Sequence, residues 1–383
     1  MTIQPETREA LLTSLRAFGL RSVEPRVATY DEEECLPRDL LAEMTALDLF
    51  GGTIPAEWSG TELDHVTFAM AIEEIARFDH ILGVLMSMPS ALVGGGVLTH
   101  GTKAQKERYL APLAVGQIFG GAGLTEPQSG SDVAGTKTHF RRDGGDFILN
   151  GSKAWISNLD IAAFFLTFAV EEGSSGRAAI SAFLVDADTP GVGRYPFKNK
   201  LGFRPICTGE LVFTDVRLPA DALLGDLGDG FTVAMTAVER GRLAVAARAV
   251  GIAQTCLDDS VAWAKERRTF GRAIATYQQI SAKLATMATE IEAARQLVRR
   301  CAELLDEGAP QARTLASMAK CFAADVAQRA ATEAVQIHGS TGVAGEVRVS
   351  RLYRDAKVFQ IVEGTNEIQR NIIARSLTGV GAR

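Results

Sequence analysis

Several features that mark whole classes of protein are missing from this sequence. The apolar runs are short, and AAFFLTFAV at 162–170 has about half of the roughly 20 residues that a membrane-spanning helix needs. The first residues, MTIQPETREALL, have neither the basic segment nor the apolar core of a secretory signal. We therefore expect a cytoplasmic protein without a membrane span.

Signatures of metal, disulfide and nucleotide sites are also missing. The five cysteines are far apart and form no CxxC pair, and the five histidines show no HExxH spacing. Neither GxGxxG nor GxxxxGK[ST] occurs. The net charge is −6 and the basic residues are scattered, so nucleic acid is not expected as a partner.

What remains is the composition of a globular chain. Apolar residues make up 46% of the 383 residues and charged residues 22%, which is enough apolar material for a buried core without a bias toward disorder. This length favours two or three domains over one.

The pattern of apolar residues changes twice along the chain. Residues 1–115 show helical spacing of three and four, as in TFAMAIEEIARF at 67–78. Residues 116–230 contain short apolar runs bounded by Gly, Pro and Asp, and residues 231–383 return to the helical period. The pattern predicts an α+β multidomain chain: an N-terminal helical domain, a middle β-barrel or sandwich domain and a C-terminal four-helix bundle.

One local signal in the middle region is DFILNGSKAWIS at 146–157. Asn and Gly tolerate the positive φ of a type I′ turn, so Asn150-Gly151 predicts a β-hairpin here.

A loop with unusual composition is AGLTEPQSGSDVAG, at 122–135. Its small residues suit a backbone that closely approaches a flat polar ligand. The plainer alternative is a helix start capped by Ser131 or Asp132. Taken alone, the loop favours this alternative.

The loop is one of six motifs that occur in the order and spacing of a known family. The motifs are GLTEPQSGSDVAG (123–135), NGSKAWISN (150–158), GELVFTDVRLP (209–219), AWAKERRTFG (262–271), QIHGSTG (336–342) and DAKVFQIVEGTNEIQR (355–370). With them the whole chain resembles the acyl-CoA dehydrogenase family. The resemblance implies the helical, β and helical domain order, FAD as cofactor, a homotetramer, and electron-transfer flavoprotein as the acceptor.

The resemblance also assigns residues to FAD. Thr125 would bind the pyrimidine edge of the flavin, Trp155 to Ser157 would cover its other face, and Arg267 would bind the diphosphate, where a guanidinium matches phosphate oxygens. Residues 336–340 and 365–367 would touch the cofactor across subunits. The full set is Ala122, Gly123, Leu124, Thr125, Ser131, Trp155, Ile156, Ser157, Arg267, Gln278, Gln336, Ile337, His338, Gly339, Ser340, Thr365, Asn366 and Glu367.

Glu363, in VEGTNEIQR, follows an apolar run and precedes Gly364. An acid near the start of a helix is mildly favoured by the helix dipole, which is the plain interpretation of this residue. The resemblance instead implies that Glu363 is the base that removes the α-proton of an acyl thioester, with a pKa raised by burial. Some family members carry the base at the position of Gly241, which has no side chain here.

The resemblance places the thioester and its carrier against a second set of residues. We expect Arg242 to be the main contact, and Glu239 to be more structural than the others. The set is Ser131, Glu239, Arg240, Gly241, Arg242 and Gly364.

Three functions stay open at this point. The first is dehydrogenation of a saturated acyl thioester, carried either on CoA or on an acyl or peptidyl carrier protein. The second is an oxygen-using oxidase or monooxygenase on the same fold. The third is a flavin-binding scaffold without catalysis, which the presence of Glu363 disfavours.

Overall fold

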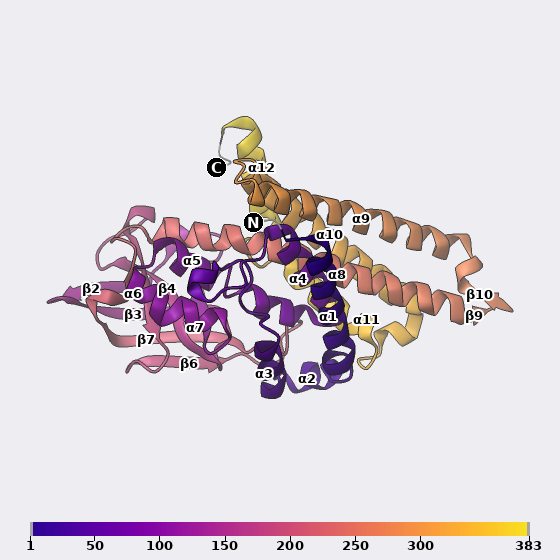
Figure 1. Ribbon diagram of the computed structural model, residues 1–383, viewed down its shortest axis with the longest axis horizontal. Helices are drawn as coiled ribbons and strands as arrows, with labels where there is room; N and C mark the ends of the chain where they lie inside the picture. The colour runs from indigo at the N-terminus through magenta and orange to yellow at the C-terminus, as the bar shows by residue number, and fades with distance from the viewer. Residues whose placement is uncertain (1–2, 381–383) are drawn as a thin grey trace.

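The computed structural model describes residues 3–380, in which helices, a β-sheet and further helices follow one another along the chain (Figure 1). This order agrees with the predicted fold class. The outer ends of the first and last predicted domains, residues 1–2 and 381–383, lie outside the described residues.

The N-terminal helices pack around α4, which is kinked at Asp79 and starts at the cap residue Asp64, whose carboxylate accepts a hydrogen bond from the Thr67 amide at 2.6 Å. Apolar residues of α1 and α4 face one another, as their spacing predicts. The helices are α1 (Pro5–Phe18), α2 (Val27–Glu33), α3 (Arg38–Ala46), α4 (His65–Ser87), α5 (Val93–His100), α6 (Lys103–Gln105) and α7 (Ala111–Ala114).

The middle region forms one sheet of strand order β6-β7-β3-β2-β4-β5-β8, with β1 pairing in parallel with β4. Phenylalanines from β2 to β5 fill its core, with Phe140, Phe147 and Phe183 in edge-to-face contact. The strands are β1 (Phe119–Gly123), β2 (His139–Asp143), β3 (Asp146–Ser157), β4 (Ala162–Glu171), β5 (Ile180–Asp186), β6 (Val192–Pro196), β7 (Thr208–Leu218) and β8 (Leu223–Leu224).

The hairpin predicted at Asn150-Gly151 is wrong. Strand β3 runs through both residues, and the pairing with β7 shifts register there, so that they form a bulge rather than a turn. The Asn150 side chain pairs with Asp215 across the bulge, at 2.8 and 3.1 Å. The turn of the β2–β3 hairpin lies earlier, at Gly144-Gly145.

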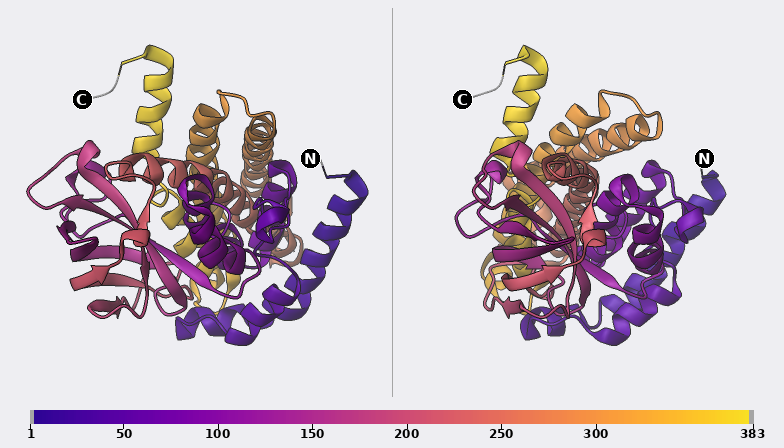
Figure 2. Two further views of the ribbon diagram at one scale, coloured as in Figure 1. Left: turned by 60° about the vertical axis from the view of Figure 1, so that its left-hand side comes forward. Right: turned by 90° about the vertical axis from the view of Figure 1, so that its left-hand side faces the viewer.

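The C-terminal region is built on α8, a helix of 37 residues and so about 55 Å long. Figure 1 shows it running from the sheet to the short β9–β10 hairpin at the opposite end of the molecule, with α9 and α10 alongside. Figure 2 shows α12 projecting from this body. The elements are α8 (Gly230–Glu266), β9 (Arg268–Thr269), β10 (Arg272–Ala273), α9 (Gln278–Asp306), α10 (Ala312–His338), α11 (Arg348–Phe359) and α12 (Asn366–Thr378).

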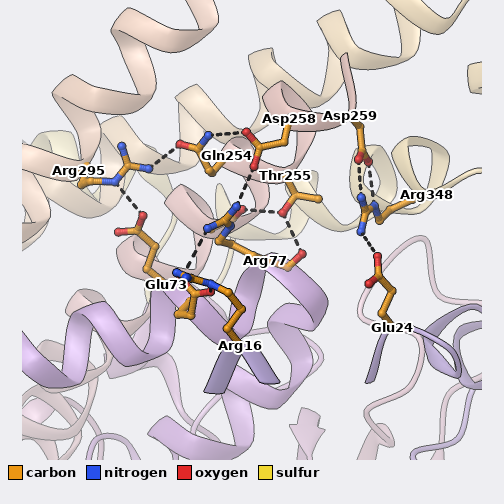
Figure 3. Close-up of polar contacts among 12 residues, drawn as sticks. Arg16, Glu24, Glu73, Arg77, Gln254, Thr255, Asp258, Asp259, Arg295 and Arg348 are labelled. Atoms are coloured by element: carbon orange, nitrogen blue, oxygen red, sulfur yellow. Dashed lines mark hydrogen bonds and ion pairs between the residues drawn. The ribbon is translucent and has the colours of Figure 1, made fainter. Parts of the chain in front are cut away.

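Ion pairs join the two helical regions (Figure 3). Arg77 of α4 pairs with Asp258 of α8 at 2.9 Å, and Arg295 of α9 pairs with Glu73 at 2.8 Å. Beneath these pairs the apolar faces of α4, α8 and α9 share one core. The helices on either side of the sheet region in the sequence therefore pack as one unit, with α8 at its centre.

Across residues 3–380, no helix combines the length and the apolar character needed to cross a membrane.

Candidate active site

Glu363 lies in the short turn between α11 and α12, and its backbone is left-handed. Its φ is 54°, and the φ of Gly364 is 86°. A left-handed conformation is favourable for glycine but costs about 1–3 kcal/mol for a side chain such as Glu, so neighbouring contacts must hold it.

Two buried donors hold this turn. Lys320 of α10 donates to the Gly364 carbonyl at 2.8 Å, and Gln369 of α12 donates to the carbonyls of Glu363 and Gly364 at 3.0 Å each. Both side chains are 0% exposed, so the bonds are shielded from water. The strained turn is thereby fixed from two helices.

The Glu363 carboxyl packs against bare backbone at Gly241 of α8. A Cβ at Gly241 would lie 2.9 Å from both Cδ and Oε2 of Glu363, closer than such atoms can approach. The structure therefore brings the two predicted positions for a base into direct contact, and the missing side chain at Gly241 makes room for the carboxyl.

The carboxyl of Glu363 is surrounded by cations but accepts no hydrogen bond from any residue in 3–380. Burial raises its pKa to about 7, against the opposing charges of Arg248, Arg242 and Lys320. The residue as a whole is half-buried, so the carboxyl remains within reach of a ligand. A carboxyl with this pKa can take up or release a proton near neutral pH.

The loop at 122–135 does not start a regular helix. Only a short 3₁₀ turn, Val133–Gly135, follows Asp132, and no side chain caps it. The Thr125 carbonyl instead accepts a hydrogen bond from the Ala154 amide at 2.8 Å, which ties the loop to β3. Two of the segments that the resemblance assigns to the flavin are therefore neighbours.

A buried ion pair lies behind this loop. Lys153 donates to Glu126 at 2.6 Å, and neither side chain is more than 1% exposed. Burial lowers the pKa of Lys153 to about 8, although Glu126 opposes this change. Burial would raise the pKa of Glu126, but Lys153 and the amides of Lys137 and Thr138 hold it below its usual value.

Trp155 is the exposed residue of the segment Trp155 to Ser157, which is predicted to cover the flavin. Its side chain is 63% exposed and its φ is 63°, whereas Ile156 is buried and Ser157 is half-buried. Phe197 supports the indole edge-to-face, with 4.9 Å between ring centroids. An aromatic face held in this way is available to a flat ligand.

The other predicted cofactor residues gather at the far end of α8. The Trp263 ring stacks on His338 at 5.1 Å, and Arg267 lies 6.0 Å above Trp263. Four of the other predicted cofactor residues that follow Arg267 or flank His338 in the sequence are exposed: Gln278, Gln336, Gly339 and Ser340. Ile337 is buried. Figure 1 shows the β9–β10 hairpin, which follows Arg267, far from the sheet that carries Trp155. One chain therefore does not bring these two groups together.

The predicted substrate residues also separate. Arg242 is 3% exposed, faces Glu363 and donates to Ser317 at 3.4 Å. Arg240 instead lines a cavity of about 30 Å³ toward α4 and the turn that precedes α5, and Glu239 pairs with Arg313 at 2.6 Å. Ser131 is exposed on its loop.

Of the predicted residues in VEGTNEIQR, Thr365 caps α12 by accepting from the Ile368 amide, and Glu367 is exposed. Asn366 is 2% exposed and its amide donates to the Cys321 carbonyl and to Asp325. Its side chain therefore has a structural role that the sequence pattern did not predict.

Comparison with known proteins agrees with this geometry. The family profile "Acyl-CoA dehydrogenase, N-terminal domain" matches residues 5–117, the corresponding middle domain matches 121–216, and the C-terminal domain matches 228–378. The chain belongs to the acyl-CoA dehydrogenase family. It is accordingly a flavin-dependent oxidoreductase.

Similar acyl-CoA dehydrogenases span nearly the whole chain. An acyl-CoA dehydrogenase of Bacillus subtilis is 42% identical over 95% of this chain and 96% of its own length. The human mitochondrial short-chain specific acyl-CoA dehydrogenase is 39% identical over 97% of this chain and 90% of its own length.

Solved structures of the family superpose closely. Butyryl-CoA dehydrogenase of Megasphaera elsdenii has a TM-score of 0.94 at 37% identity, covering 98% of this chain and 99% of that one. The prolyl acyl carrier protein oxidase AnaB has a TM-score of 0.92 at 30% identity, with coverage of 98% and 100%. A glutaryl-CoA dehydrogenase of Mycobacterium smegmatis in complex with FADH2 has a TM-score of 0.93 at 29% identity, with coverage of 99% and 96%.

The residues present fit the flavin that this family uses. The exposed face of Trp155 lies beside the loop that carries Thr125, and the exposed Arg267 offers a cation for a phosphate group. Trp155 is in β3 of the sheet, whereas Arg267 follows the far end of α8.

Several site residues escaped the sequence prediction: Glu126, Lys153, Arg248, Lys320 and Gln369. A signal existed for Arg248, which interrupts the apolar run LAVAARAVGIA at 243–253. Lys320 and Lys153 gave no such signal, because their partners lie 44 and 27 residues away in the sequence.

Proposed function

We propose that this acyl-CoA dehydrogenase removes two hydrogens from a saturated acyl thioester to give the trans-2-enoyl thioester, using FAD. The observation that carries the proposal is the Glu363 carboxyl, which is partly buried, has no hydrogen-bond donor among residues 3–380 and has a pKa raised by burial to about 7. An acid in this state is a suitable general base for the α-proton of a thioester.

The chain's own residues supply binding, orientation and proton transfer. Trp155 and the loop carrying Thr125 would hold the flavin ring, and Arg242 would bind near the thioester's carrier. Lys320 and Gln369 hold the turn, so the carboxyl of Glu363 is aimed at one place, where an oxygen of the carboxyl takes the α-proton. Bound FAD supplies an acceptor for the β-hydride.

The distance between the Trp155 and Arg267 groups supports a further part of the proposal. A single chain offers the ring and phosphate contacts at separate places, so we propose a homotetramer in which subunits share each FAD. We also propose that electron-transfer flavoprotein is the electron acceptor and that the protein is cytoplasmic.

Flavin bleaching by a panel of acyl thioesters tests the proposed reaction directly. Anaerobic addition of saturated acyl-CoAs of increasing length to the FAD-loaded enzyme should bleach the visible flavin absorbance for at least one of them. If no CoA thioester does so, the CoA proposal is wrong, and acyl groups on carrier proteins are tested in the same assay. Rapid reoxidation of the reduced enzyme by air would indicate an oxidase instead of a dehydrogenase.

A further inference from the structure

Arg248 is a buried cation in the middle of α8 that the proposed reaction does not use. It is 5% exposed, and its Nε and Nη1 atoms are buried without a hydrogen-bond acceptor in residues 3–380. Buried charges are normally paired, because an ion removed from water without a partner is strongly destabilising. Lys153 and Lys320 follow that rule, since both donate to oxygen atoms.

The surroundings of Arg248 form a niche for its side chain. A Cβ on Gly83 of α4 would lie 2.9 Å from both Cγ and Cδ of Arg248, so that glycine leaves room for the arginine. The guanidinium lies 5.9 Å from the Phe203 ring and 5.6 Å from the Phe359 ring. The ring faces attract the cation, but they do not accept hydrogen bonds from its N–H groups, which lie in the plane of the guanidinium.

Arg248 shares a helix face with the base. It follows Gly241 by seven residues, which is two turns and about 10 Å along α8. Helical side chains lean toward the helix N-terminus, so Arg248 leans toward Gly241 and the carboxyl packed on it. The charge of Glu363 accordingly acts on Arg248, opposing the burial that lowers the arginine's pKa to about 10.

The order of groups along α8 then suggests what Arg248 meets. Of the residues that we expect near the thioester's carrier, Glu239 and Arg240 precede Gly241 and Arg242 is next to it. Gly241 and Glu363 mark the reacting carbons, and Arg248 lies two turns beyond them, on the side away from Glu239 and Arg240. An acyl chain running past Glu363 would end near the guanidinium. We expect room for only a few carbons, because Arg248 is roughly 10 Å from Gly241 along α8 and its side chain takes up part of that length.

We propose that Arg248 binds a carboxylate at the far end of a short acyl group, so that the preferred substrate is a mono-thioester of a dicarboxylic acid. This inference rests on the proposed function for the placement of the thioester. A guanidinium forms two parallel hydrogen bonds with one carboxylate, through Nη2 and either Nε or Nη1, so a bound carboxylate would give a partner to one of the two buried donors. The remote carboxylate takes no part in the bond changes at the α- and β-carbons.

A simpler role must be separated from this one. If Arg248 only balances the charge of Glu363, its loss would affect all acyl thioesters alike. If it binds the remote carboxylate, its loss would affect only substrates that carry one.

Binding to the FAD-loaded Glu363→Gln variant separates these roles without turnover. Calorimetry with glutaryl-CoA and butyryl-CoA should show tighter binding of glutaryl-CoA. Adding Arg248→Met should weaken glutaryl-CoA binding by about 10- to 100-fold, the effect of one lost charge-assisted contact, and leave butyryl-CoA within about threefold. Arg248→Gln keeps a polar side chain and is measured in parallel in case Arg248→Met does not fold. Retained flavin absorbance shows that a variant has folded.

The matched control is Arg177→Met in the same background. Arg177 also lies over an aromatic ring, that of Phe231 at 4.8 Å, but it is exposed and remote in sequence from the site. Its loss should change neither affinity. Equal weakening of both thioesters by Arg248→Met, or tighter binding of butyryl-CoA before that change, would overturn the inference.

Flavin bleaching by the wild-type enzyme tests the proposed function separately. If butyryl-CoA bleaches the flavin and glutaryl-CoA neither binds nor bleaches, the dehydrogenase proposal stands and the role of Arg248 is refuted. If neither thioester bleaches the flavin but the binding pattern holds, the Arg248 site stands and the proposed reaction is refuted.

Discussion

The sheet contributes the buried Glu126 to the site and the helical body contributes the half-buried Glu363, and the two carboxyls differ in their hydrogen bonds and in the direction in which their pKa is shifted. Glu126 receives hydrogen bonds from Lys153, from the Gln128 side chain and from two backbone amides, and its pKa lies below the usual value. Glu363 receives none from residues 3–380, and its pKa is raised to about 7. Burial acts in the same direction on both carboxyls.

The comparison shows that donors, more than depth, decide what a buried acid does. A carboxylate with its lone pairs filled is fixed in its charged form and holds a loop in place. A carboxylate near cations that do not bond to it keeps its proton affinity and stays free to react. The two parts of the site therefore separate structural support from chemistry.

Removing the unbonded acid should have the largest effect. Glu363→Gln keeps the shape of the side chain but cannot take a proton, so we expect flavin reduction by the true substrate to slow by about 10³-fold or more. Stopped-flow reduction under anaerobic conditions measures this rate. Glu346→Gln, at an exposed position, is the control and should reduce at the wild-type rate; a similar rate in both variants would place the base elsewhere.

Breaking the bonded pair should affect stability instead. Lys153→Met leaves Glu126 buried without its cation, at a cost of about 3–5 kcal/mol in the free energy of unfolding. Denaturant unfolding measures this cost, with Lys137→Met as the control, because the exposed Lys137 bonds to Glu126 only through its backbone amide. Replacing Glu126 by Met as well should recover most of the loss; an unfolding free energy for Lys153→Met equal to the control would contradict the comparison.

The smallest expected effect is a difference in pH dependence. Because folding raises the pKa of Glu363 from 4.5 to about 7, its contribution favours the folded state below pH 4.5 and is lost as pH rises toward 7, by at most about 3 kcal/mol. The stability of Glu363→Gln relative to wild type should therefore increase from pH 5 to 7 and then stay level. Glu126 has the opposite sign, since a lowered pKa loses its stabilising effect as pH falls.

Unfolding free energies of the wild type and Glu363→Gln between pH 5 and 8 measure this difference. A constant difference over that range would show that the Glu363 carboxyl is ionised throughout. The rate of flavin reduction gives a second reading, because only the ionised carboxyl accepts a proton, so the rate should rise with pH around 7.

The sequence predicts the parts of this molecule that depend on local pattern. Helical spacing identifies the two helical regions, and Asp64 marks the start of α4. The resemblance points to Glu363 and to the empty position at Gly241. These features are readable because each depends on residues close together in the chain or on a motif.

The parts that failed depend on contacts between distant segments. Asn150-Gly151 has the composition of a turn, but its pairing with β7 makes it a bulge, while Gly144-Gly145 forms the turn. Lys320 looks like one of many helical lysines until packing brings it to the carbonyl of Gly364. The charge of Arg248 is visible in the sequence, but the lack of an acceptor is visible only in three dimensions.

The contact between Gly241 and the Glu363 carboxyl has a consequence for how the site can change. Two backbone positions 122 residues apart in the sequence face the same small volume, and only one of them can fill it. The reaction needs a carboxyl at that point in space, and a side chain at either position 241 or position 363 could place one there. The position of the base in the sequence can therefore change, whereas the position of its carboxyl in the folded protein cannot.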